Sequence, residues 1–412
     1  MNYSSFLSWF KSKKFLNRVF ILILIIKPLL DTFYDLTLFG NITFLKVIGI
    51  LIFLICFYTI LARKKVVYHS SLGLIFTWAA LYTINLILVL LFNLNMNVLS
   101  EVFKMGMTVY ILYYFLREVR SEQDVLGYLF AYLLSLIFLI GGFAYSDIFI
   151  QEVEITRGAE RIITVYGDIG SIGIQYNLGF IVLIFLASAN SLLKVNSILP
   201  RIIPVYIIVG FYILLKIHHS ASYIIFFILL GYYAFVSARQ NALRTLLLGF
   251  LISIPVSIYY YDQIFENVNN LINNDIQVVQ GEKDAEAAFH GRGRRWVKHW
   301  GYFTSGSFLN YFIGLVGIEH PELVGHGPHN DYLRMTFSSG LIGSLSFIFF
   351  NLGIALRVTL SNMALGVKFG ILAIIGFWFL QSVSLTPSSY HAFNFVYGPL
   401  IILSLKWKTI QK

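Results

Sequence analysis

The sequence predicts an all-α, polytopic membrane protein: about twelve transmembrane helices in a single integral membrane domain, 1–412. Of the 412 residues, 58% are hydrophobic and only 12% are charged, and the mean hydropathy is +0.76. A soluble protein needs far more charge to cover its surface. The apolar residues also form continuous runs, and about 20 such residues in a helix cross the hydrocarbon core of a bilayer.

The apolar runs predict where each transmembrane helix lies. We expect helices at 18–38, 43–62, 72–92, 98–116, 126–148, 169–190, 201–217, 220–237, 244–261, 332–356, 365–386 and 392–405. The segment 262–331, between the ninth and tenth helices, is then one large external loop.

The basic residues predict the orientation of the helices, because cytoplasmic loops carry an excess of lysine and arginine. With the N-terminus inside, the cytoplasmic segments contain Lys11, Lys13, Lys14, Arg63, Lys64, Lys65, Arg117, Arg120, Lys194, Arg201, Arg239, Arg244, Arg357, Lys406 and Lys408. The short outer turns near Gly40, Asn95 and Ser388 contain none. Both termini are therefore expected to be cytoplasmic.

Three external segments break this rule. They contain, in chain order, Arg157 and Arg161; Lys216, His218 and His219; and Lys283, Arg292, Arg294, Arg295 and Lys298. Basic residues on the outer face predict a site for an anionic ligand. The alternative is that they are merely solvated, since long loops cross the membrane whatever their charge. We prefer that alternative for Lys283.

The spacing from Arg292 to Phe303 predicts a helix in the large loop. Arg292, Arg295 and His299 fall on one face of it. The adjacent apolar stripe consists of Trp296, Trp300 and Phe303. Such a helix would lie in the headgroup layer with its aromatic groups buried and its basic groups facing an aqueous cavity. The alternative is an interfacial anchor without chemistry, and the two roles are compatible.

A turn at 327–330 leads into the tenth helix and places His329 at the helix N-terminus. The helix dipole disfavours imidazolium there, and a neutral imidazole can accept a proton as a general base. Tyr332, Leu333 and Thr336 follow on its face, and Gly340 and Gly343 would let another helix or a lipid chain pass closely. The alternative is a hydrogen-bonded structural histidine.

These residues resemble the bacterial O-antigen polymerase and O-antigen ligase superfamily. Arg292 to Trp296 resembles its arginine-x-x-x-tryptophan element, and Gly314-Leu315-Val316-Gly317 resembles the glycine pair that follows. The signature His329-Asn330-Asp331-Tyr332-Leu333, followed by Gly340-Leu341-Ile342-Gly343, carries most of the likeness. The match covers about 50 residues, and the layout of twelve helices with a large late external loop also fits.

The resemblance implies a membrane glycosyltransferase that moves a glycan from a polyprenyl diphosphate carrier onto an acceptor hydroxyl, at the outer face of the bacterial cytoplasmic membrane. By this likeness His329 activates the acceptor and Arg292 engages the diphosphate. Further residues expected to contact the diphosphate or the glycan are Arg157, Arg161, Lys216, His219, Arg294, Arg295, His299, Asn330 and Tyr332.

One departure from the family concerns the start of the eighth helix. The family has a serine-arginine-glycine element there, whereas this chain reads His218-His219-Ser220-Ala221-Ser222-Tyr223. The second phosphate contact could come instead from Lys216, His218 or His219, or from Arg157 and Arg161.

The residue types suit metal-independent chemistry. Arginine holds phosphate oxygens with a planar fork and keeps its charge, and fixed cations stabilise the charge of a diphosphate leaving group. The acids of the large loop form no compact pair that would indicate a metal, so we expect neither metal nor cofactor. Within the first helix, Lys27 and Asp31 are expected to neutralise each other, with Pro28 between them.

The leading hypothesis is a polymerase that joins lipid-linked oligosaccharide units into a surface polysaccharide. A ligase that transfers finished glycan to another acceptor would use the same site. A transporter or flippase for lipid-linked sugars is the alternative from another class, but it should carry its polar residues near the bilayer midplane. The expected partners are the lipid-linked oligosaccharide, the bilayer, a flippase and a chain-length regulator; no nucleic acid is expected.

Overall fold

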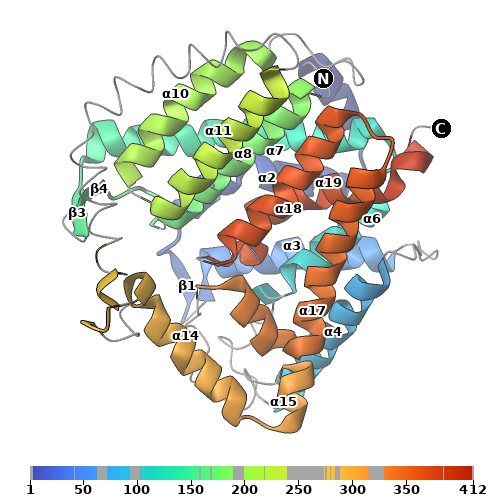
Figure 1. Ribbon diagram of the computed structural model, residues 1–412. Helices are drawn as coiled ribbons and strands as arrows, with labels where there is room; N and C mark the ends of the chain where they lie inside the picture. Colours follow the sequence, from blue (N-terminus) through green and yellow to red (C-terminus); the bar gives the residue numbers. More distant parts are fainter. Residues whose placement is uncertain are drawn as a thin grey trace.

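The computed structural model is built almost entirely of helices (Figure 1). It describes residues 3–40, 42–62, 72–92, 103–104, 106–156, 159–167, 169–188, 199–217, 219–238, 273, 276–278, 280–283, 288–314, 329–383 and 385–410. The predicted ninth helix, 244–261, and most of the large loop before 288 lie outside these residues.

Helices lie at all of the remaining predicted positions. They are α2 (Phe15–Asp31), α3 (Phe44–Leu61), α4 (Gly73–Phe92), α6 (Met107–Glu118), α7 (Glu122–Tyr145), α8 (Ile169–Ser188), α10 (Leu199–Ile217), α11 (Ser220–Ala238), α17 (Asp331–Leu360), α18 (Leu365–Gln381) and α19 (His391–Ile410). The π-helical turn η2 (Ser146–Ile150) extends α7, and the 3₁₀ turn η5 (Pro387–Ser389) precedes α19.

Four helical segments of the described chain are long and apolar enough to cross a membrane: Phe44–Leu61, Gly73–Phe92, Glu122–Ile150 and Asp331–Leu360. Shorter apolar helices cover Ser171–Ala187, Ile202–Ile217, Ala221–Tyr233 and Leu365–Gln381. The fold is thus that expected of an all-α membrane protein. Two small antiparallel hairpins, β1 (Thr37–Phe39) with β2 (Ile42–Thr43) and β3 (Val153–Thr156) with β4 (Ala159–Ile162), join neighbouring helices.

The core is organised around α8. Almost every side chain between Ile172 and Leu186 is buried, because α7, α10, α11, α18 and α19 all pack against this helix. A helix that is apolar all round lies either in a protein core or in a membrane, and α8 is enclosed by other helices of this chain.

A short helix that the apolar runs did not predict, α1 (Tyr3–Ser12), closes one end of the bundle. The Trp9 ring packs edge-on against Tyr128 of α7 at 5.2 Å, and its Nε1 donates to Asp124 at 3.0 Å. Asp124 also accepts from Lys13 and completes a capping box with Ser121. One carboxylate therefore starts α7 and fixes α1 on it. In α2, the predicted ion pair between Lys27 and Asp31 is confirmed.

The helix α17 is broken near its start. Gly340 has φ 64° and ψ −173°, a backbone conformation open almost only to glycine. A side chain at Gly340 would meet the backbone of Phe312 and Ile313, at the end of α15 (Phe308–Ile313). A side chain at Gly314 would meet the backbone of residues 338–340. The predicted close approach at Gly340 is therefore confirmed, and two glycines of the family-like motifs lie against each other.

Asn85 of α4 stabilises this kink. Its Nδ2 donates to Ile313 O at 3.0 Å and to Ser338 O at 2.8 Å, on the two sides of the close approach. Asn85 is buried. A helix kink exposes carbonyl groups that must find donors elsewhere, and here a side chain from another helix supplies one.

We expect Gly340→Ala to lower the free energy of unfolding by more than about 2 kcal/mol, because the new side chain meets backbone and the backbone conformation becomes strained. Gly353→Ala in the same helix is the matched control, since nothing lies within 4 Å of its added carbon. Unfolding can be followed as the heat-induced labelling of buried Cys56, the single cysteine of the chain, by a thiol dye. Equal melting temperatures for the two variants would contradict this account of the kink.

Candidate functional site

The basic segment of the large loop forms the helix α14 (Ala288–Ser305), as predicted. Its side chains Arg294, Arg295 and Lys298 are exposed, and Arg292 is half-buried. Figure 1 shows α14 along the lower edge of the molecule, beside α15 and outside the main group of helices. The arginines therefore lie on a surface helix, where an anionic group can reach them.

The predicted division of α14 into a basic face and an aromatic face is wrong for His299. His299 is only 4% exposed, stacks on Phe337 of α17 with ring centres 5.4 Å apart, and bonds through Nδ1 to Arg295 O at 2.7 Å. Trp300, expected to lie in the headgroup layer, is 48% exposed on the protein surface. His299 shares its face with Phe303 one turn later, and both pack on α17.

The cluster of His299, Phe303, Tyr311 and Phe337 fastens α14 to the first segment of α17, before the kink. Phe303 is 1% exposed and lies 5.8 Å from Phe337 and 5.1 Å from Tyr311, between ring centres. His299 thus works as a packing residue. The consequence for the site is that the arginine helix and the segment that follows His329 are joined by direct contact.

His329 precedes α17, as predicted, and its side chain is exposed. Its φ is 49°, in the left-handed region. Asn330 caps the helix: its Oδ1 accepts from Leu333 N at 3.0 Å, while its Nδ2 donates to Val383 O at 3.2 Å. Tyr332 donates from its hydroxyl to Phe379 O at 2.8 Å. Asn330 and Tyr332, expected to contact substrate, therefore also hold α17 against the end of α18.

Asp331 is the residue of this motif to which the sequence assigned no role. Its buried carboxylate accepts from Trp378 Nε1 at 3.1 Å, Ser388 N at 2.9 Å and Ser388 Oγ at 2.6 Å. Its own N–H donates to Ser382 O at 2.8 Å. Arg334, one turn further along α17 and also buried, adds electrostatic attraction. Asp331 therefore binds the start of α17 to both ends of the connection between α18 and α19.

The other predicted cationic residues are used differently. Lys216 pairs with Asp147 at 3.7 Å, and Tyr212 donates to the same carboxylate, so an acid already offsets part of the lysine charge. His219 bonds through Nδ1 to Ser222 Oγ at 2.7 Å. The backbone of Arg161 pairs in register with that of Glu154 in the β3–β4 hairpin.

Arg157, His218 and Leu315 to Gly317 lie outside the described residues. Within the described part of the chain, no group of three or more His, Cys, Asp or Glu side chains is arranged to hold a metal ion.

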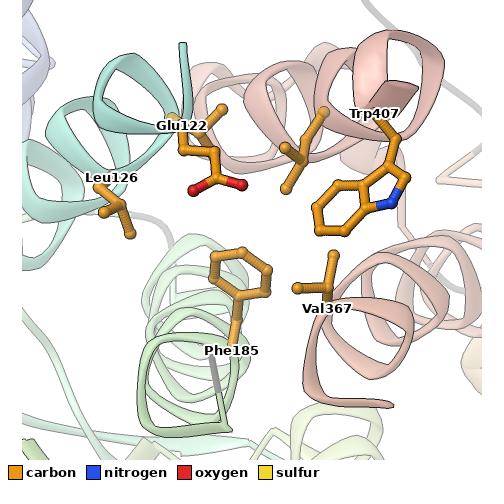
Figure 2. Close-up of a pocket in the computed structure, with 7 residues that line it drawn as sticks. Glu122, Leu126, Phe185, Val367 and Trp407 are labelled. Atoms are coloured by element: carbon orange, nitrogen blue, oxygen red, sulfur yellow. The ribbon is translucent and has the colours of Figure 1, made fainter. Parts of the chain in front are cut away.

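A small pocket lies at the other end of the same helices. Figure 2 shows the carboxylate of Glu122 pointing toward the space between Phe185, Val367 and Trp407, with Leu126 beside it. Val367 is near the start of α18 and Trp407 near the end of α19, whereas Asp331 contacts the end of α18 and the segment before α19. This pocket is therefore separate from the residues around His329.

No protein-family model matches the chain, and no curated protein matches its sequence.

We expect Asp331→Asn to lower the free energy of unfolding by about 3 kcal/mol. An amide in place of the carboxylate can accept at only one atom, and its NH₂ group would face the donors of Trp378 and Ser388. The same Cys56 labelling measures the change. Asp35→Asn, at an exposed carboxylate, is the control. A melting temperature for Asp331→Asn equal to that of the control would show that the three hydrogen bonds contribute little.

Proposed function

We propose that this chain is a membrane glycosyltransferase that joins polyprenyl-diphosphate-linked oligosaccharide units into a surface polysaccharide. The observation that carries the proposal is the contact between α14 and α17, through His299, Phe303 and Phe337. It joins the arginine-rich helix to the segment that follows His329. A cation cluster and a candidate base on connected elements are what transfer from a diphosphate requires.

In the proposed reaction, an acceptor hydroxyl attacks the anomeric carbon of the donor glycan. The new carbon–oxygen bond forms as the bond to the diphosphate breaks, and the hydroxyl proton passes to His329. The diphosphate leaves on its lipid carrier, with its charge stabilised by Arg292 and by the exposed Arg294 and Arg295. Because Lys216 already pairs with Asp147, we assign the second phosphate contact to α14.

The proposed topology has twelve membrane crossings with both termini cytoplasmic, in the bacterial cytoplasmic membrane. In its support, α1 and the end of α19 lie on the same, upper right side of Figure 1, and α14 lies on the opposite side. With the basic α14 at the outer face, the glycan would be elongated outside the cytoplasm, where the lipid-linked units are presented.

The test is the surface glycan of a deletion strain, compared by gel with strains that express wild-type, Arg292→Ala, His329→Ala or Lys283→Ala protein. We expect a single repeat unit on its normal acceptor in the deletion strain. Wild type and Lys283→Ala, a control at an exposed lysine of the same loop, should restore long chains. Each site variant should reduce chain synthesis by about 100-fold or more.

Other outcomes of the same gels would contradict the polymerase. Long chains that accumulate on the lipid carrier in the deletion strain would identify a ligase. Repeat units retained on the cytoplasmic side would identify a transporter. Full activity of His329→Ala would exclude His329 as the base.

A further inference from the structure

Buried polar atoms without a hydrogen-bond partner gather where α18 ends and α19 begins. Among the described residues they include both amide atoms of Gln381, Ser382 Oγ, His391 Nε2 and Asn394 Oδ1. The side chains of Gln381 and Ser382 are completely buried, and Asn394 is 1% exposed. Each such atom costs about 1–3 kcal/mol. Several in one place indicate a group that these atoms bind.

The end of α18 and the start of α19 are linked through Asp331 and Ser388. Trp378, Gln381 and Ser382 share a face of α18, by their spacing of three and four residues, and Trp378 donates to Asp331. His391 and Asn394 share a face of α19 by the same rule. Asn394 Nδ2 donates to Ser388 O at 2.7 Å, and Ser388 in turn donates to Asp331. The face of α18 that carries Trp378 therefore turns toward Asp331, two residues after His329, and Asn394 of α19 reaches Ser388 beside it.

The unpartnered atoms define the chemistry of the ligand. An amide, a hydroxyl and an imidazole offer closely spaced donors and acceptors without a net charge. The carboxylate of Asp331 already accepts three hydrogen bonds, and Lys27, which acts electrostatically on His391, is paired with Asp31. A neutral ligand with several hydroxyl groups fits this set better than an anion or a cation.

We propose that Gln381, Ser382, His391 and Asn394 form a binding site for an uncharged sugar unit. We identify this sugar as part of the transferred glycan, and that identification rests on the proposed function. The unit bound here would lie next to His329 and present a hydroxyl to it. The unpartnered atoms of these side chains are covered in this structure, so the side chains move when the sugar enters.

Gln381→Leu and Ser382→Ala test the site without harming the fold. Each removes only atoms that have no partner, and replacing such a group by an apolar one of similar shape is neutral or stabilising. Asn310→Leu is the matched control. Both of its amide atoms are also buried and unpartnered, but it lies in α15, near the kink of α17.

Binding is measured on the purified full-length protein in detergent micelles by saturation-transfer NMR with glucose, galactose, rhamnose and N-acetylglucosamine. We expect wild type and Asn310→Leu to bind at least one of these sugars. Gln381→Leu and Ser382→Ala should each weaken that binding by about tenfold, with melting temperatures at or above that of wild type. Absence of binding to wild type, or equal binding by all variants, would overturn the proposal.

The same variants separate this proposal from the proposed function. If wild-type protein restores long chains in the deletion strain and Gln381→Leu restores them fully, the sugar site is wrong while the polymerase stands. If the wild-type protein binds sugar at Gln381 but the deletion strain keeps an intact surface glycan, the proposed polymerase function is wrong while the sugar site stands.

Discussion

The buried carboxylate of Asp331 is the interaction on which the candidate site depends. A buried charge is costly unless donors surround it, and here Trp378 and Ser388 supply three. The donors come from α18 and from the turn before α19, so the carboxylate holds three helices in one arrangement. That arrangement fixes where α17 begins, and with it the position of His329.

The kink at Gly340 is the second constraint on this region. It gives α17 a short first segment that is free to take its own direction, with α15 against its end and α14 on its side. A straight helix would carry Phe337 elsewhere and remove the ring contacts that His299 and Phe303 make with α17. The position of the arginine helix therefore follows from one glycine conformation and from Asn85, whose amide bonds to carbonyls on both sides of the contact.

The helices were predictable because an apolar run is a local property of the sequence. The helix through Arg292 to Phe303 and the pairing of Lys27 with Asp31 were predictable for the same reason, since both depend on a spacing of a few residues. What remained hidden depends on contacts between distant parts of the chain. The burial of His299 requires Phe337, and the role of Asp331 requires Trp378 and Ser388. An acidic residue in the first turn of a helix is common, so the local sequence carried no signal for the buried role of Asp331.

The measurement that tests the central claim most directly uses vesicles that contain the purified protein and repeat units on their polyprenyl diphosphate carrier. Glycan length and the release of free carrier diphosphate are followed together. The account predicts that wild-type protein releases carrier as the glycans lengthen, and that His329→Ala protein, folded with an unchanged melting temperature, does neither. Repeat units that cross the bilayer without any lengthening or release of carrier would contradict it.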